Sequence, residues 1–218
     1  MTRRLIDICL ALVILPFLCP FFFVIGLAVV LESRGSPFYG GQRIGKDGKR
    51  FRMWKFRTMV SGADRLGSAI TTPHDPRVTK LGWLLRKTKL DELPQFFNLL
   101  VGDLTLVGPR PEDPGIVEKY TSEQAQILRV KPGITGPVQL RYTTLEAEAI
   151  PDTKDAMQFY VARVLDEKLR LDLEYLNTRT FFSDCSVVLQ TILLMVRSLT
   201  RTGEPAVSCA EPGRLPEA

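Results

Sequence analysis

The sequence predicts an α/β chain, with a compact, mostly helical domain that contains a small β-hairpin and is joined to an N-terminal membrane helix. Three patterns lead to this prediction. Residues 8–31 carry no charge, an Asp-Gly pair at Asp47-Gly48 separates two strand-like segments, and later segments place apolar side chains at helical spacing. The length of 218 residues allows one domain and an appendage. We therefore divide the chain into a membrane segment (1–33), a domain (34–202) and a disordered tail (203–218).

Composition narrows the possible partners and chemistry only in part. The net charge of +5 and the pI near 9.1 suit anionic lipid, an anionic substrate or nucleic acid, and select none of them. The four cysteines have no paired or metal-type spacing, which argues against a disulfide framework and fits a reducing, cytosol-facing domain. His74 is the only histidine, so a histidine-based zinc site or a Ser-His-Asp triad has little support.

The apolar run Ile8–Leu31 is long enough to cross a bilayer, since a straight helix of this length would measure about 36 Å. It is too long for a signal peptide and lacks a small-x-small cleavage site. Pro16 and Pro20 predict a bend within it. Basic residues flank both ends: Arg3, Arg4, Arg34, Arg43, Lys46, Lys49 and Arg50. These flanks favour a re-entrant hairpin, but prolines also occur in spanning helices, so the residues alone leave both topologies open.

The domain begins with a predicted β-hairpin. Ser36–Ile44 and Arg50–Met59 have strand character, and Lys46-Asp47-Gly48-Lys49 joins them with a strong turn signal. A polar loop that contains glycine and proline covers Ser61–Pro76, and Leu81–Lys87 predicts a short helix or turn.

Leu90–Val101 predicts a helix that ends at Gly102. Its apolar face has i, i+3, i+4, i+7 spacing and consists of Leu93, Phe96, Phe97 and Leu100. Asp91, Gln95 and Asn98 share the opposite face. Glu92 lies about 100° round the helix from Asp91, so both carboxylates can open on one cleft.

Shorter elements follow this helix. Leu104–Val107 predicts a buried strand, Pro111–Tyr120 a helix, and Ser122–Arg129 a second helix with a serine N-cap. Lys131–Gly136 predicts a turn-rich loop.

Two longer helices complete the domain. Asp155–Thr178 is amphipathic, with an inward face made of Phe159, Val164, Leu165, Leu169, Leu173 and Leu176. The last helix begins near Ser183 and ends with Arg197 and Arg201. Its apolar residues are Val187, Val188, Ile192, Leu193 and Met195. They fit either core packing or a helix that lies on the bilayer surface.

The most informative stretch of the chain is residues 87–112. The acidic pair Asp91-Glu92 directly follows the basic residues Arg86, Lys87 and Lys89, and the Gly-Pro-Arg-Pro turn Gly108–Pro111 comes next. Solvated surface charge, or acidic residues favoured by a helix dipole, is the ordinary interpretation of such a pair. Behind an apolar N-terminus, the combination indicates phosphate chemistry at a membrane surface.

Three motifs in order show a resemblance to a known family: KFRTM at Lys55–Met59, the stretch Asp75–Pro111, and KPGITG at Lys131–Gly136. With them, nearly the whole chain to about Thr200 resembles the bacterial sugar transferases, which are monotopic polyprenyl-phosphate phosphoglycosyl transferases. The resemblance implies an α/β domain on a re-entrant helix, on the cytoplasmic face of the bacterial inner membrane. Family members often carry a tryptophan and an Asn-Gly-Arg stretch after the last motif, and residues 136–142 lack them. The serine that usually precedes the bend proline is also absent.

The resemblance implies a membrane-bound enzyme that moves a sugar-1-phosphate from a UDP-sugar to polyprenyl (undecaprenyl) phosphate and releases UMP. By match to the family motif, Asp91 is the nucleophile that forms a covalent phosphosugar intermediate. Glu92 is its acidic neighbour, which helps with the metal, with the proton on the acceptor phosphate, or with both. Both carboxylates are expected to hold Mg²⁺. This reaction would be the first membrane step in the assembly of capsule, exopolysaccharide, O-antigen or glycoprotein.

The expected substrate-binding residues surround this pair. Arg86 is the candidate phosphate clamp because an arginine can grip two oxygens at once. Arg110, between Pro109 and Pro111, is a second candidate contact to donor phosphate or nucleotide. Lys55 and Arg57 fit either phosphate binding or surface charge near lipid headgroups. Gln139 lies in the divergent stretch, which is the candidate region for sugar selection.

Two other classes of function compete with the transferase. One is a membrane-tethered, non-catalytic scaffold of a glycan assembly complex, which would tolerate the loss of Asp91. The other is a spanning enzyme of phospholipid synthesis, which would show several long spans and an Asp-rich metal motif. The expected partners are the donor, the acceptor and inner-membrane lipid, with no nucleic acid. A homo-oligomer and contacts with downstream glycosyltransferases are further expectations.

Overall fold

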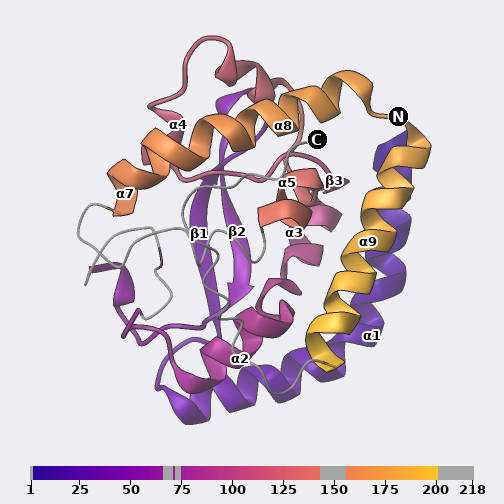
Figure 1. Ribbon diagram of the computed structural model, residues 1–218. Coiled ribbons are helices and arrows are strands. Elements are labelled where there is room, and N and C mark those ends of the chain that lie inside the picture. Colours follow the sequence, from indigo (N-terminus) through magenta and orange to yellow (C-terminus); the bar gives the residue numbers. More distant parts are fainter. Residues whose placement is uncertain (1, 66–70, 72–74, 143–155, 201–218) are drawn as a thin grey trace.

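The computed structural model describes residues 2–65, 71, 75–142 and 156–200, and shows a mostly helical domain beside one long N-terminal helix (Figure 1). Two small two-stranded sheets lie within the domain. The predicted mostly helical domain with a small hairpin and a long apolar N-terminal helix is therefore confirmed. His74, the acidic stretch 144–155, Arg201 and the tail 203–218 lie outside the described residues.

Helix α1 (Thr2–Glu32) contains both Pro16 and Pro20. Among the described residues, it alone is long and apolar enough to cross a membrane, with a hydropathy of 2.9 over its most apolar window. In Figure 1, α1 descends on the right and then turns to run along the bottom of the molecule. The predicted bend is thus present, and prolines favour it because each lacks a backbone donor and crowds the preceding turn.

Both ends of α1 are fastened to the domain. Near its start, Arg4 donates hydrogen bonds to the carbonyl oxygens of Leu99 and Leu100, at 2.5 and 2.7 Å. One turn later, the buried carboxylate of Asp7 accepts bonds from the Thr105 hydroxyl (2.8 Å) and the Leu106 N–H (3.1 Å).

Near the other end of α1, Val29 is buried against Phe56 and Leu85 of the domain. The opposite face of the helix remains open, and its exposed side chains include Phe17, Phe21, Phe23 and Leu31. An exposed apolar surface of this length is typical of a membrane contact.

The predicted hairpin is confirmed with shorter strands, β1 (Phe38–Ile44) and β2 (Arg50–Phe56), which pair antiparallel. The connection adopts left-handed backbone at Asp47 (φ 57°) and Gly48 (φ 74°), a conformation that Asp and Gly tolerate best. One face of the hairpin packs on α1, where the Phe22 ring lies 5.7 Å from that of Phe56. The other face, which includes Lys55, lines a cleft described below.

The predicted helix Leu90–Val101 is wrong as a single element. Helix α2 (Lys80–Thr88) ends at Lys89, whose φ of 60° is left-handed. A 3₁₀ turn (Leu90–Glu92) follows, and helix α3 (Gln95–Val101) begins only after Pro94. Pro94 has no N–H to donate, so the helical bonding cannot run unbroken through this position.

The polar face of α3 points into the protein. Gln95 and Asn98 are each only 2% exposed, whereas Phe97 is 42% exposed. The Asn98 side chain accepts a hydrogen bond from the Trp54 N–H (3.0 Å) and donates one to the Arg52 carbonyl (2.7 Å). This amide therefore continues the edge of β2 and ties α3 to the hairpin.

A second sheet pairs β3 (Thr105–Val107) with β4 (Gly133–Thr135) in parallel. The predicted strand Leu104–Val107 is confirmed with a one-residue difference, whereas the prediction of a loop at Lys131–Gly136 missed β4. Gly133 lies so close to Gly108 that a Cβ atom would approach the Gly108 nitrogen to 2.1 Å. This contact fixes the position where the Gly-Pro-Arg-Pro turn begins.

The two short helices predicted after this turn need correction. The segment predicted as Pro111–Tyr120 contains only α4 (Pro114–Val117), which Asp113 caps by accepting a bond from the Gly115 N–H. The segment predicted as Ser122–Arg129 is a 3₁₀ helix (Gln124–Arg129). Its first turn is closed by Thr121, which exchanges hydrogen bonds with Gln124, and not by a serine cap. Helix α5 (Pro137–Tyr142) follows β4.

The long C-terminal helices agree more closely with the ranges predicted from the sequence. Helix α7 (Ala156–Phe159), a π-helical turn (Tyr160–Val164) and helix α8 (Leu165–Thr178) form one continuous rod. The predicted inward residues lie in or against one core cluster.

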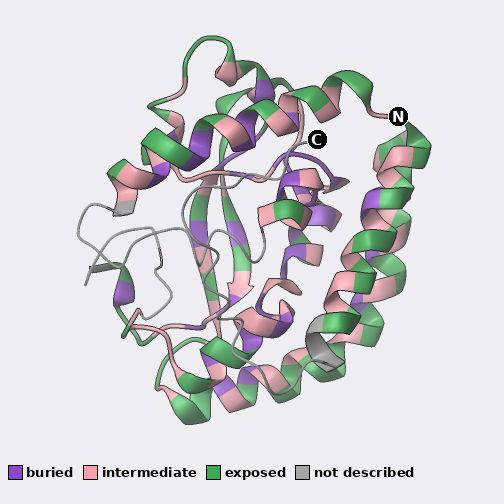
Figure 2. Cartoon of the chain, viewed as in Figure 1, coloured by how far each residue is buried: buried purple, intermediate pink, exposed green. Residues whose placement is uncertain are grey.

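Helix α9 (Phe181–Thr200) starts two residues before the predicted Ser183. Its Val187 is buried, whereas Ile192 and Leu193 are about half exposed (52% and 48%). Figure 2 shows exposed residues along both α1 and α9. One face of α9 is therefore packed, while another presents apolar side chains outward.

Candidate active site

Asp91 and Glu92 lie on the 3₁₀ turn between α2 and α3, at the point where the predicted helix is broken. The left-handed Lys89 and the helix-breaking Pro94 bracket this turn. Asp91 is only 5% exposed, and the Glu92 side chain is 14% exposed. The break therefore places two adjacent carboxylates at the inner end of a cleft.

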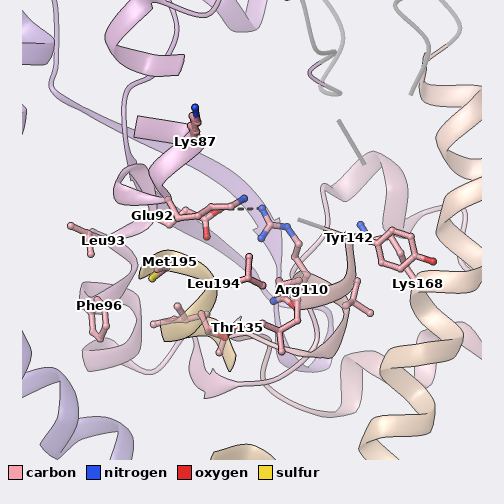
Figure 3. A pocket seen from close by; sticks show the side chains of 16 residues that line it. Lys87, Glu92, Leu93, Phe96, Arg110, Thr135, Tyr142, Lys168, Leu194 and Met195 are labelled. Atoms are coloured by element: carbon pink, nitrogen blue, oxygen red, sulfur yellow. Dashed lines mark hydrogen bonds and ion pairs between the residues drawn. The ribbon is translucent and has the colours of Figure 1, made fainter. Parts of the chain in front are cut away.

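Two cations from distant parts of the chain hold Glu92. The Lys55 ammonium on β2 lies 2.9 Å from Glu92 Oε1, and the Arg110 guanidinium lies 3.2 Å from the same oxygen. Figure 3 shows Arg110 reaching toward Glu92 across the site. Burial alone would raise the pKa of Glu92, but Lys55 and Arg110 outweigh it and hold that pKa well below its usual range. Glu92 is thus ionised at neutral pH.

Asp91 has a different environment. Burial raises its pKa, although Lys55, Lys89 and Arg86 act in the opposite direction. Its Oδ1 atom is buried and finds no hydrogen-bond partner within the described part of the chain. A buried carboxylate oxygen without a partner is costly in a folded protein, so its presence indicates a group kept for a ligand or a reaction.

The carboxylates of Asp91 and Glu92 are of the ligand type that a magnesium ion prefers. Mg²⁺ prefers oxygen ligands, needs only one or two carboxylates, and takes its remaining ligands from water and substrate phosphates. No cluster of three or more His, Cys, Asp or Glu side chains suited to a metal occurs among the described residues. The donor set is therefore two carboxylates, one of them with a free oxygen.

A polar cleft of about 700 Å³ opens above the pair. The predicted site residues that line it are Lys55, Arg57, Arg86, Asp91, Glu92 and Arg110. Arg86 donates from Nε to the Thr58 hydroxyl at 2.8 Å, which fixes one edge of its guanidinium. The cleft thus brings together cations from β2, α2 and the Gly-Pro-Arg-Pro turn, as an anionic ligand requires.

The other predicted substrate-binding residues differ in where they lie relative to the polar cleft. Arg57 lines the cleft, but its guanidinium also donates to the carbonyl oxygens of Ser33 and Arg34 just after α1. Pro109 and Pro111 are buried on either side of Arg110. Gln139 lies on α5 and lines a second hollow.

That second hollow, called the apolar pocket below, has a volume of about 150 Å³ and lies between α3, α5 and α9 (Figure 3). Seven of its sixteen lining residues are hydrophobic: Leu93, Phe96, Ile134, Val138, Leu140, Leu194 and Met195. It shares four lining residues with the polar cleft, namely Lys89, Glu92, Arg110 and Lys168. The two hollows therefore meet at Glu92.

The sequence analysis missed a buried network behind Arg110. Glu112 Oε1 accepts a hydrogen bond from the Tyr160 hydroxyl (2.6 Å) and pairs with Lys168 (3.2 Å). Asp172 hydrogen-bonds the Arg110 backbone, and burial, only partly offset by Lys168 and that bond, raises the Asp172 pKa to about 7. The signal was present, because Lys168 and Asp172 share the inward face of α8 with Leu165 and Leu169.

The chain is similar to known proteins along most of its length. The family model of the bacterial sugar transferases matches residues 1–198. The chain is 39% identical over 194 residues to the UDP-glucose:undecaprenyl-phosphate glucose-1-phosphate transferase of Escherichia coli K12, covering 87% of this chain and 39% of that protein.

Two further relatives have a somewhat lower sequence identity to this chain. Identity is 31% over 195 residues with the UDP-N-acetylgalactosamine-undecaprenyl-phosphate N-acetylgalactosaminephosphotransferase of Aeromonas hydrophila, covering 87% of this chain and 42% of that protein. The chain is 34% identical over 207 residues to the exopolysaccharide production protein ExoY of Rhizobium meliloti 1021. This match covers 88% of this chain and 84% of that protein. The chain therefore spans about two fifths of the first two relatives and most of the third.

Proposed function

This chain belongs to the bacterial sugar transferase family, and we propose that it transfers a sugar-1-phosphate from a UDP-sugar to undecaprenyl phosphate and releases UMP. The names of two relatives describe this type of reaction, with glucose in one and N-acetylgalactosamine in the other. The observation that carries the proposal is the pair at the base of the polar cleft. Asp91 keeps a buried oxygen without a partner, and Glu92 beside it is held ionised by Lys55 and Arg110.

The reaction proceeds as two displacements at one phosphorus atom. Asp91 Oδ1 attacks the phosphorus that bears the sugar, the bond from that phosphorus to the bridging oxygen breaks, and UMP leaves. A phosphate oxygen of the acceptor then attacks the same phosphorus, the bond to Asp91 breaks, and the carboxylate is regenerated. A carboxylate nucleophile divides one transfer between two phosphates into two easier steps.

The surroundings of Asp91 suit this role. Its low exposure limits the access of water to a covalent intermediate. Arg86 and Arg110 line the polar cleft on both sides of the pair and can bind phosphate oxygens. Asp91 and Glu92 would hold Mg²⁺, which when bound neutralises charge on the diphosphate.

The proposed location is the cytoplasmic face of the inner membrane, with α1 as a re-entrant helix. Support comes from the two ends of α1, which both contact the same domain, through Arg4 and Asp7 at one end and Val29 at the other. A helix whose two ends bind one domain leaves both ends on the side where that domain lies. The exposed apolar face between them would enter the bilayer.

The test is a single half-reaction. Purified protein incubated with Mg²⁺ and a panel of UDP-sugars labelled in the sugar, without lipid acceptor, should release UMP and retain the label. Asp91→Asn should abolish both signals, since an amide is not a nucleophile for phosphorus. Asp47→Asn, an exposed acid on the hairpin loop, is the matched control and should leave both intact. Normal UMP release and labelling by Asp91→Asn would overturn the assignment.

A further inference from the structure

The apolar pocket differs from the polar cleft in what it can bind. Its walls come from α3 (Phe96), from β4 and α5 (Ile134, Val138) and from α9 (Leu194, Met195). Figure 3 shows Leu194 and Met195 among the side chains that line the pocket together with Glu92 and Arg110. A sugar would need a hydrogen bond for each hydroxyl that it buries, and the hydrophobic side chains of the pocket cannot supply one. The hydroxyls of Thr135 and Thr191, which also line the pocket, already bond each other at 2.7 Å. A hydrocarbon needs only space and apolar contact.

The pocket is continuous with the membrane helix. Phe96 and Ile134, which line it, also pack against Ala11 and Leu15 in the middle of α1. A ligand in the pocket is therefore separated from α1 by one layer of side chains. An exposed apolar residue of α9, Val196, directly follows the pocket residue Met195. This is the direction from which a lipid would arrive.

The other end of the pocket is charged. Lys87, Lys89 and Arg110 line it together with Glu92. A ligand with a hydrocarbon body and an anionic head would satisfy both ends, with its head at the position where the polar cleft and the apolar pocket meet. Lys89 and Arg110 border both hollows, so an anion placed there lies next to the catalytic carboxylates.

We propose that the apolar pocket binds the isoprenoid unit nearest the phosphate of the acceptor lipid and guides that phosphate to Lys89 and Arg110, beside the carboxylate pair. The proposal rests on the function proposed above and adds the residues that recognise the acceptor. Apolar cavities of about this volume hold a molecule of about the size of benzene, so the pocket has room for about one isoprenoid unit. Donor and acceptor then approach the carboxylate pair through different openings, as a two-step transfer requires.

The test compares two neighbouring residues of α9. Leu194→Trp fills the pocket, whereas Leu193→Trp places the same side chain at an exposed position that does not line it. Both variants are assayed in detergent, so that membrane attachment does not contribute. Leu194→Trp should keep the acceptor-independent labelling and the KM for the UDP-sugar. Its KM for undecaprenyl phosphate should rise about tenfold or more, the factor expected from losing the burial of about two methylene groups. Leu193→Trp should match the wild type.

Cross-linking provides a second measurement that needs no turnover and no variant. A geranyl phosphate analogue with a diazirine on its first isoprenoid unit should label the 181–200 peptide of the wild-type protein. Excess undecaprenyl phosphate should prevent that labelling. The inference is overturned if Leu194→Trp leaves the acceptor KM unchanged or raises only the donor KM, or if the cross-link falls outside α3, α5 and α9. Absence of UMP release by the wild type would instead count against the proposed function, while the cross-link would still decide whether the pocket binds the lipid.

Discussion

At the scale of single residues, Asp91 and Glu92 are neighbours in the sequence with opposite electrostatic surroundings. Lys55 and Arg110 both bond Glu92, which lowers its pKa, whereas burial raises the pKa of Asp91. Paired carboxylates whose pKa values are pushed apart usually have different roles. The permanently ionised Glu92 suits charge balance and metal binding, and the more basic Asp91 with its open oxygen suits attack on phosphorus.

Arg86 provides a prediction at the same scale. One edge of its guanidinium is held by Thr58, which leaves the other edge to face the cleft that contains Asp91. Arg86→Ala should lower kcat/KM about 100-fold or more in detergent at saturating Mg²⁺. Arg86→Lys should recover only part of the loss, because lysine keeps the charge but cannot grip two oxygens. Steady-state kinetics with a UDP-sugar and undecaprenyl phosphate measure both.

A control variant separates the phosphate role from a structural one. Thr58→Val removes the bond to Nε but keeps the arginine, and should lower kcat/KM by about tenfold, the lower end of what one hydrogen bond to a charged group contributes. Thermal unfolding of all three variants monitors the fold. Equal losses in Thr58→Val and Arg86→Ala would mean that Arg86 serves only to hold Thr58 in place.

At the scale of elements, local sequence patterns predicted those helices and strands that are determined by residues close together in the sequence. The hairpin followed from Asp47-Gly48, and the inward face of α8 from its periodicity. The break at residues 89–94 was missed because the apolar period runs through it. Pro94, which is compatible with the first turn of a new helix, was the only local warning. The strand Gly133–Thr135 could not be predicted locally, because it exists only through its pairing with Thr105–Val107.

The site also contains residues that the sequence analysis named and residues that only the structure revealed. The family motif identified the carboxylate pair and its cations, but Lys168 and Asp172 reach it from a helix about 80 residues further along the chain. Their role depends on burial against Glu112 and Tyr160, which no local spacing reveals. Charged residues on the inward face of an amphipathic helix were the available signal, and they indicate a buried polar network.

The buried network that contains Asp172 predicts that the stability of the folded protein depends on pH. The Asp172 pKa of about 7 lies above its unfolded value near 3.8, so the folded state binds a proton that the unfolded state has lost between these values. That contribution to stability is complete below about pH 4 and disappears as the pH rises through about 7. The wild type should therefore lose several degrees of Tm between pH 5 and pH 8. Asp172→Asn should lose less, because the amide stays neutral throughout.

Unfolding in detergent can be followed by the fluorescence of the two tryptophans. Asp166→Asn, an exposed acid on the same helix, is the control and should keep the wild-type pH dependence. The assignment fails if Asp172→Asn and the wild type lose the same amount of Tm over this range. Lys168, Glu112 and the backbone of Arg110 surround Asp172.

At the scale of the whole molecule, the domain acts as a clamp on α1. Arg4 and Asp7 fasten the first two turns to α3 and β3, and Val29 packs near the end of the helix. The bend that contains Pro16 and Pro20 allows both attachments at once (Figure 1). In the topology proposed above, a helix held in this way would present its outer face to the bilayer and keep Asp91 near the lipid headgroups.

This arrangement predicts the topology of the full chain in cells. Epitope tags at residue 2 and at the C-terminus should both be protected from protease added to the periplasmic side, because the proposed topology leaves both ends of α1 with the domain in the cytoplasm. Pro16→Ala together with Pro20→Ala should straighten the helix, since alanine restores two backbone donors and removes the ring clash. The straightened helix is long enough to span, so the N-terminal tag should become sensitive to protease and activity should fall. Pro114→Ala, at the first turn of α4, should change neither. A protease-sensitive N-terminal tag in the wild type would establish a spanning helix and rule out the clamp.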